Sequence, residues 1–138
     1  VFYERGVARA LAGLPDAAVD DLAHALELDP EDTFARTLLG LALVEAGRVE
    51  ESVLEFELGA GDGLDPRAHL LAALAHAAFD DDGGWRHLEM ARVGAEGTEE
   101  LLVEEVETAL DRGAEAAREM LVKTLAPTTL RERLQERP

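Results

Sequence analysis

The four histidines are the residues best suited to bind a metal ion, yet their spacing does not favour a site. His69 and His76 lie seven residues apart, which places them two turns apart on one helix face. Two imidazoles at that separation rarely close on one ion without a third ligand, and the chain has no HxxxH pair. His24 and His87 have no evident partners in the sequence. We therefore interpret all four as structural and expect no metal site.

The other reactive side chains also lack a catalytic pattern. The only serine, Ser52, stands where a small residue is needed for packing. Asp80-Asp81-Asp82-Gly83 faintly resembles a calcium loop but lacks the spaced acids and closing Glu of an EF-hand, so we expect a solvated turn. There is no GxSxG, P-loop or GxGxxG motif. We expect neither enzymatic activity nor a cofactor.

Trp85 is the only tryptophan and follows two glycines. It could anchor a binding surface, because tryptophan is enriched in interaction hot spots. A lone tryptophan at the start of a helix is more often part of the core, where it would compensate for an alanine-rich interior. We therefore expect Trp85 to be buried.

Composition narrows the fold and the class of partner. Hydrophobic residues make up 47% of the 138 and aromatics only 4%, and the abundant Ala and Leu favour helices. The net charge of −17 disfavours nucleic acid, and no apolar run is long enough for a membrane span. Without cysteines or a signal peptide we expect a cytoplasmic protein. A removed export signal remains an alternative, since the chain opens on Val1.

The sequence repeats at an interval of 34 residues. Five pairs share it: Gly6 and Gly40, Gly13 and Gly47, Ala18 and Ser52, Leu22 and Phe56, and Ala25 and Gly59. The Asp-Pro at 29–30 recurs two residues late, at 65–66, which indicates an insertion within 59–63. Glycine in mid-helix lets a paired helix approach closely, which must offset roughly 1 kcal/mol of lost helix propensity.

Two of these units resemble the tetratricopeptide repeat, a helix–turn–helix of 34 residues. The segment GLPDAAVDDLAHALELDP at 13–30 is the most specific match, and AGRVEESVLEF at 46–56 echoes it. The resemblance is clear over residues 3–66 and degenerate after about residue 94. It implies an all-α fold, a right-handed superhelix of antiparallel helix pairs. We expect one domain over 1–138, part of a longer chain, with units at 1–32, 33–66, 67–96 and, in degenerate form, 97–126.

Periodicity predicts helices over 2–12, 15–28, 32–46, 49–59, 66–80, 84–94, 97–112, 114–125 and 128–136. Repeat arrays need a terminal cap that is apolar inside, and Leu130 and Leu134 suit the segment 127–138 to that role. Arg131, Arg133 and Arg137 make this segment the only basic one. A second hypothesis is therefore that it folds back over the inner face of the stack.

The resemblance also implies where a partner binds, because such repeats hold partner segments on a concave face lined by the first helix of each unit. The aligned positions are Tyr3, Val7, Thr37, Leu41, Val44, Ala73 and Ala77. The carboxylate clamp of the chaperone-binding branch needs Lys and Asn, and this chain has no Asn and a single Lys, Lys123. We expect a scaffold for a protein or peptide, such as a basic or amphipathic helix. Homo-oligomerisation and a regulatory role within a larger enzyme or signalling protein are the alternatives.

Overall fold

The computed structural model describes residues 1–63 and 65–136, and the regular structure in them is entirely helical. The helices are α1 Phe2–Leu11, α2 Pro15–Leu28, α3 Thr33–Glu45, α4 Val49–Ala60, α5 Pro66–Ala77, α6 Gly83–Gly94, α7 Thr98–Arg112, α8 Ala114–Met120, the π-helix η1 Leu121–Leu125, and α9 Ala126–Glu136. The all-α prediction is confirmed. In this part of the chain no helix has both the length and the apolarity to cross a bilayer.

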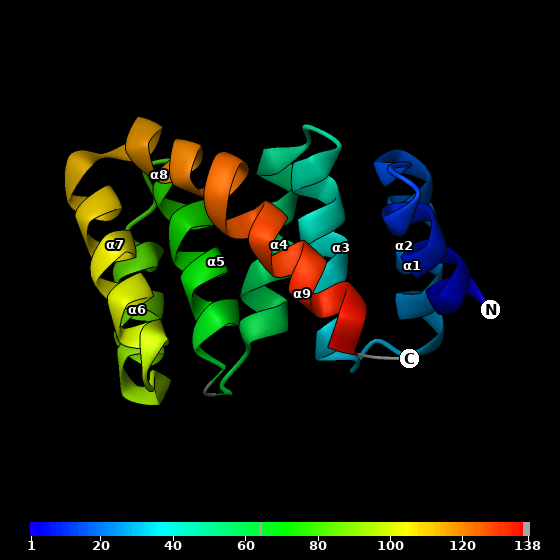
Figure 1. Ribbon diagram of the computed structural model, residues 1–138, viewed down its shortest axis with the longest axis horizontal. Helices are drawn as coiled ribbons and strands as arrows, with labels where there is room; N and C mark the ends of the chain where they lie inside the picture. Colours follow the sequence, from blue (N-terminus) through cyan, green and yellow to red (C-terminus); the bar gives the residue numbers. More distant parts are fainter. Residues whose placement is uncertain (64, 137–138) are drawn as a thin grey trace.

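The helices from α1 to α7 form a row in which each packs against the next in sequence (Figure 1). Helix α5 is the centre of this row, because it contacts α4, α6, α7, α8 and η1. Every residue of α5 from Ala68 to His76 is buried, so its small side chains are enclosed on all sides. We use the name first-helix face for the side of the row formed by α1, α3 and α5, the first helix of each expected pair.

The 34-residue interval recurs in the turns that join the first two helix pairs. Gly13 and Gly47 have φ of +75° and +78°, the left-handed region that a glycine adopts without a steric cost. Around them Leu14 N–H donates to Arg9 O at 2.9 Å and Arg48 N–H donates to Leu43 O at 2.8 Å. This is the hydrogen-bond pattern that ends a helix at a left-handed glycine. The sequence repeat is therefore also a repeat of backbone geometry.

Glycine also permits the close crossing within each of these pairs. A β-carbon at Gly40 would lie 2.6 Å from Cε1 of Phe56, and one at Gly6 would lie 3.0 Å from Cγ of Leu22. Phe56 and Leu22 are both buried against the facing glycine. The expected close approach of the paired helices is confirmed at both positions.

The C-terminal segment differs most from prediction. Residues 114–136 run as one helical segment through η1, without the expected break near residue 127. Pro127 lacks the N–H that would bond to the carbonyl of Lys123, and the wider π-turn, closed by Ala126 N–H on Leu121 O, lies just before it. Helix α9 crosses α3 and does not cap the end of the row, so the expected capping position is wrong (Figure 1). Residues 137–138 of the expected cap, including Arg137, lie outside the described residues.

Trp85 is 42% exposed, so the expectation that it fills the core is wrong. The buried residue at this position is its neighbour Gly84, where a β-carbon would lie 2.7 Å from the carbonyl oxygen of Ala73. This contact brings α6 against α5 through backbone atoms, so no large side chain fits between the two helices there. Ser52 is buried, and its hydroxyl donates to Val49 O at 2.6 Å, as its packing role predicts.

Gly40→Ala should destabilise the protein. On an open helix this change would stabilise by about 1 kcal/mol, but here the new methyl overlaps the Phe56 ring, and overpacking should cost about 1–3 kcal/mol. Gly6→Ala is the matched control, with a smaller expected loss because its contact with Leu22 is longer. The free energy of unfolding in urea measures both. A Gly40→Ala variant as stable as wild type would contradict the close crossing.

Candidate functional site

The first-helix face is closed over α3 and α5 by the chain itself. Helix α9 packs on α3, whereas α8 and η1 pack on α5 (Figure 1). Of the expected partner-binding residues, Thr37, Leu41, Val44 and Ala73 are buried, while Tyr3, Val7 and Ala77 are partly exposed. The part of this face that α9 leaves uncovered therefore lies on α1.

Ion pairs and apolar contacts hold α9 in place. Arg133 Nη2 donates to Asp65 Oδ2 at 2.7 Å, and its guanidinium lies 5.6 Å from the ring centre of Phe34. Arg67 Nη1 donates to Glu132 Oε2 at 3.0 Å and to the hydroxyl of Thr129 at 2.9 Å. Leu130 is buried in the common core and Leu134 packs at its margin. One face of α9 is thus apolar and another carries the charges that pair with α5 and its N-cap.

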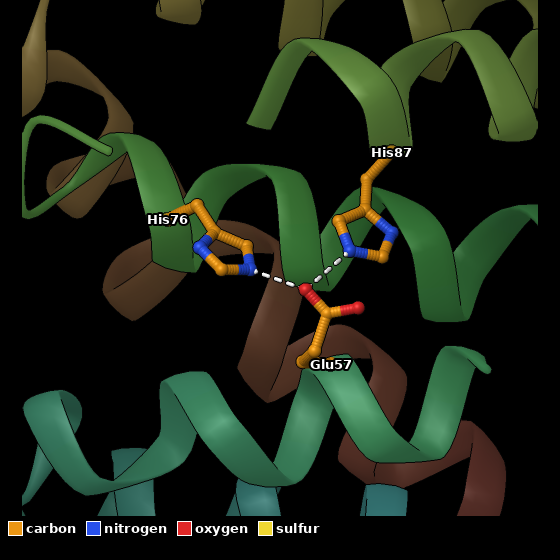
Figure 2. A group of neighbouring side chains, drawn as sticks. All are labelled: Glu57, His76 and His87. Carbon is orange, nitrogen blue, oxygen red and sulfur yellow. Dashed lines mark hydrogen bonds and ion pairs between the residues drawn. The ribbon is translucent and has the colours of Figure 1, made fainter. Parts of the chain in front are cut away.

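A second cluster of polar groups lies between α4, α5 and α6 and consists of Glu57, His76 and His87, one from each helix (Figure 2). Glu57 Oε1 lies 2.8 Å from Nε2 of His76 and 2.9 Å from Nε2 of His87. One ligand atom from each of the three residues lies within 4.8 Å of the others. The two imidazole rings are stacked, with centroids 5.5 Å apart, so both present the same edge to the carboxylate.

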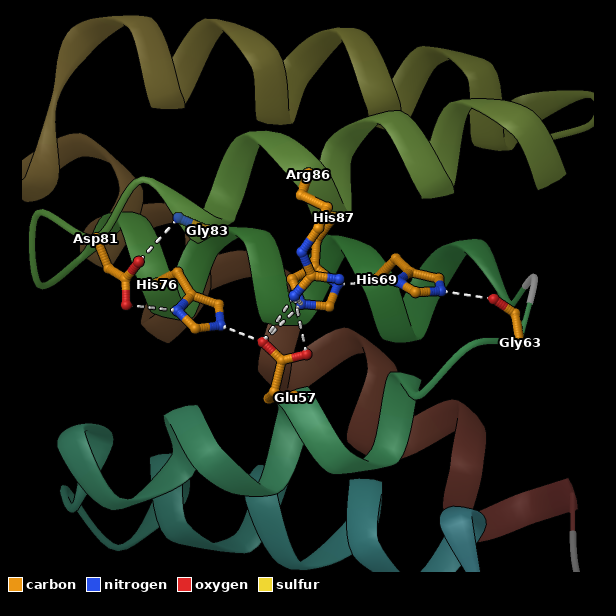
Figure 3. Close-up of polar contacts among 8 residues, drawn as sticks. All are labelled: Glu57, Gly63, His69, His76, Asp81, Gly83, Arg86 and His87. Atoms are coloured by element: carbon orange, nitrogen blue, oxygen red, sulfur yellow. Dashed lines mark hydrogen bonds and ion pairs between the residues drawn. The ribbon is translucent and has the colours of Figure 1, made fainter.

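The outward nitrogen of each ring in this cluster also has a partner (Figure 3). His76 Nδ1 lies 3.0 Å from Asp81 Oδ2, and the other oxygen of Asp81 accepts from Gly83 N–H at 2.8 Å. His87 Nδ1 lies 2.9 Å from Nδ1 of His69, whose Nε2 lies 2.6 Å from the carbonyl oxygen of Gly63. Two hydrogen-bonded chains therefore run outward from Glu57, one through each of its histidines.

The repeat explains how the backbone brings these groups together. His76 occupies the position in α5 that Gly40 occupies in α3, so an imidazole stands where the preceding pair has its closest crossing. Glu57 follows Phe56, the residue that fills that crossing in the preceding pair. His87 lies one turn after Gly84, which sets the short distance between α5 and α6. The cluster thus replaces an apolar contact of the preceding repeat with a polar one.

The charges of this cluster are unevenly distributed. Burial by itself would raise the pKa of Glu57, but hydrogen bonds from His87, His76 and Arg86 outweigh it and lower the pKa to about 2. Burial lowers the pKa of His87, although its hydrogen bond to Glu57 acts in the opposite direction. Arg86 Nη2 lies 3.1 Å from both oxygens of Glu57. At neutral pH Glu57 is therefore a carboxylate, and cationic or hydrogen-donating groups surround it.

Sequence reasoning missed this cluster because it needs three helices. The expectation that His87 has no partner is wrong, since His87 contacts both Glu57 and His69. His69 and His76 do not meet each other but are joined through His87, the third group that their spacing required. The sequence signal was the repeat itself, because folding the helix of His87 back onto that of His69 and His76 brings the three rings to one seam. His24 lies elsewhere, stacked on Phe2.

Comparison of the chain with protein-family models, with curated proteins and with solved structures gives no match. The functional argument therefore depends on the geometry of the chain itself.

Glu57→Gln should lower the stability at pH 7 by about 1–3 kcal/mol, because the amide replaces a carboxylate that accepts several charged or strong hydrogen bonds. The folded-state pKa is depressed, so this contribution is complete above the unfolded value of 4.5 and is lost as the pH falls toward about 2. Urea unfolding of both proteins from pH 7 to pH 2.5, with a chelator present, measures the difference. A difference that grows on acidification would contradict the assignment.

Proposed function

We propose that this chain is a non-enzymatic protein-interaction scaffold whose first-helix face binds an amphipathic helix carrying arginine. The architecture that we infer for it is a right-handed superhelix of antiparallel helix pairs, similar to tetratricopeptide repeats. The observation that carries this proposal is the position of α9, an amphipathic helix that already lies on that face across α3. A surface that holds one such helix has the shape and charge to hold another of the same chemistry.

The chemistry of the α9 contact defines the partner. Leu130 supplies the apolar anchor, and Arg133 pairs with Asp65 while facing the ring of Phe34. The last 26 residues hold 4 acids and 5 bases, whereas the whole chain has a net charge of −17. A partner helix with leucine and arginine one turn apart would therefore be attracted to the same site, and the surrounding negative charge would speed its association.

Competition with α9 would make this binding conditional. An occupant that belongs to the same chain reduces the apparent affinity of a partner by the fraction of time that the face is open. Tyr3 and Val7 on α1 lie beyond α9 and remain partly exposed, so a longer partner helix could begin to bind there. We therefore expect the partner to displace α9 and to extend onto α1.

Releasing α9 should expose the site. The full-length variant Leu130→Asp with Arg133→Glu removes the apolar anchor and reverses the charge that faces Asp65. A labelled peptide with the wild-type sequence of 121–138 should bind this variant about tenfold more tightly, or better, than it binds the wild-type chain, as fluorescence anisotropy would show.

Two controls make this experiment specific. Arg131→Glu alters the same charge on an exposed position of α9 and should leave peptide affinity close to that of the wild-type chain. A peptide that carries the Leu130→Asp and Arg133→Glu changes should bind neither protein. Equal affinity of the wild-type peptide for the released and wild-type chains, with circular dichroism showing both folded, would refute the proposal.

Self-association is a second candidate function, supported by the α1–α2 end of the row. Val1, Leu11 and Leu28 are exposed there, although large apolar side chains usually pack against a neighbour. In a stacked dimer, this end of one chain would cover an apolar surface of a second copy. Sedimentation velocity over a range of concentrations distinguishes the two, because a monomer at high concentration contradicts stacking.

A further inference from the structure

The Glu57, His76 and His87 cluster has the composition and supporting contacts of a metal centre. We propose that it binds one divalent transition-metal ion of the zinc class through Glu57 Oε1, His76 Nε2 and His87 Nε2. Two imidazoles and one carboxylate form a known ligand set for zinc and for non-haem iron. Here the three ligand atoms already converge on one point from three helices (Figure 2).

The hydrogen bonds behind the rings support this assignment. A histidine that binds a metal donates its other ring N–H to a carboxylate, a carbonyl or another fixed acceptor, which sets its tautomer and orientation. His76 has Asp81 in this role, and His87 has His69 (Figure 3). Both rings are therefore held with Nε2 toward Glu57, which is the orientation that coordination needs.

Donor and acceptor matching fixes the tautomers along the longer chain. The carbonyl oxygen of Gly63 can only accept, so His69 must carry its proton on Nε2. His69 Nδ1 then accepts, and His87 must donate from its own Nδ1. A neutral His87 consequently directs the lone pair of Nε2 toward the carboxylate of Glu57, a contact that is favourable only with a cation between them.

Arg86 partly fulfils that cationic role in the structure. Its Nη2 lies 3.1 Å from each oxygen of Glu57 and 3.3 Å from Nε2 of His87. The side chain of Arg86 is 60% exposed, so it can leave the cluster without breaking the core. Arg86 is therefore a competitor of the metal ion for the same electron pairs.

Coordination would require only a small rearrangement. Metal–ligand distances of roughly 2.0–2.1 Å in a tetrahedron place the ligand atoms roughly 3.4 Å apart. Glu57 Oε1 lies 2.8 Å and 2.9 Å from the two nitrogens, so it must withdraw by roughly half an ångström to admit a zinc ion at these distances. Glu57 is only partly buried, whereas His87 is fully buried, so the carboxylate is the ligand that moves.

The ligand types select the ion and the site's position defines its role. Imidazole nitrogen prefers zinc and its transition-metal neighbours, whereas magnesium and calcium prefer sites made wholly of oxygen. Glu57 belongs to α4, in the second expected unit, and the histidines belong to α5 and α6, in the third. A bound ion would therefore clamp two neighbouring repeats, with its remaining position available to water on the side of Arg86.

Titration of the metal-free, full-length protein with zinc chloride tests this proposal. We expect one Zn²⁺ per chain by isothermal titration calorimetry, a higher melting temperature with Zn²⁺, and the visible absorption of low-symmetry cobalt when Co²⁺ is used. Glu57→Gln and His76→Asn each remove a ligand and should abolish these signals. His69→Gln disturbs only the supporting contact and should weaken binding roughly 10- to 100-fold.

Arg86→Ala gives the sharpest result, because removal of a competing cation should tighten Zn²⁺ binding, whereas loss of a merely structural ion pair would not. His24→Ala is the matched control, a histidine outside the cluster whose removal should leave binding unchanged. Mg²⁺ and Ca²⁺ should give no saturable binding. Zn²⁺ binding that survives Glu57→Gln, or a wild-type protein that binds no Zn²⁺ while circular dichroism shows it folded, would overturn the proposal and leave a structural polar network only.

Discussion

The close crossing of paired helices is the constraint on which the rest of this structure depends. Gly6 and Gly40 have no side chain at the crossing, and Leu22 and Phe56 fill the space that this leaves. The crossing distance fixes the separation between neighbouring helices, and this separation repeats along the row. The third pair keeps the same tight spacing through Gly84, whose backbone packs on Ala73, although the glycine now belongs to the second helix of the pair. That exchange frees the equivalent position on α5 for His76.

The sequence predicted the fold class and most helix boundaries because these depend on local signals. Gly13 and Gly47 end helices through their own φ values, and Asp65 caps α5 through its own carboxylate. The C-terminal segment was less predictable. Proline at 127 was interpreted as a new helix start, whereas the chain accommodates it by widening the preceding turn into a π-helix. Whether α9 caps the row or folds over α3 depends on contacts such as Arg133 with Asp65, 68 residues apart, which local periodicity does not report.

The candidate sites differ in how far the sequence could reach them. The first-helix face follows from periodicity, because Leu41 and Val44 lie on one side of a helix; their burial depends on α8, η1 and α9, which only the tertiary structure places. The histidine cluster was not predicted because no two of its members share a recognisable motif. His87 appears unpartnered along the chain since its contacts come from Glu57 and His69, 30 and 18 residues earlier. A rule that searched equivalent positions of adjacent repeats would have found it.

The two candidate sites meet at the connection between α4 and α5, where the 34-residue interval gains two residues. Gly63, in that connection, supplies the carbonyl oxygen that fixes His69 and through it His87. Asp65 caps α5 and pairs with Arg133 of α9. A change in how Glu57 and His87 are held therefore reaches the anchor of α9 through fewer than ten residues of backbone and two hydrogen bonds. Because the inserted residues serve both the polar cluster and the closure of the first-helix face, the departure from the repeat carries as much functional information as the repeat itself.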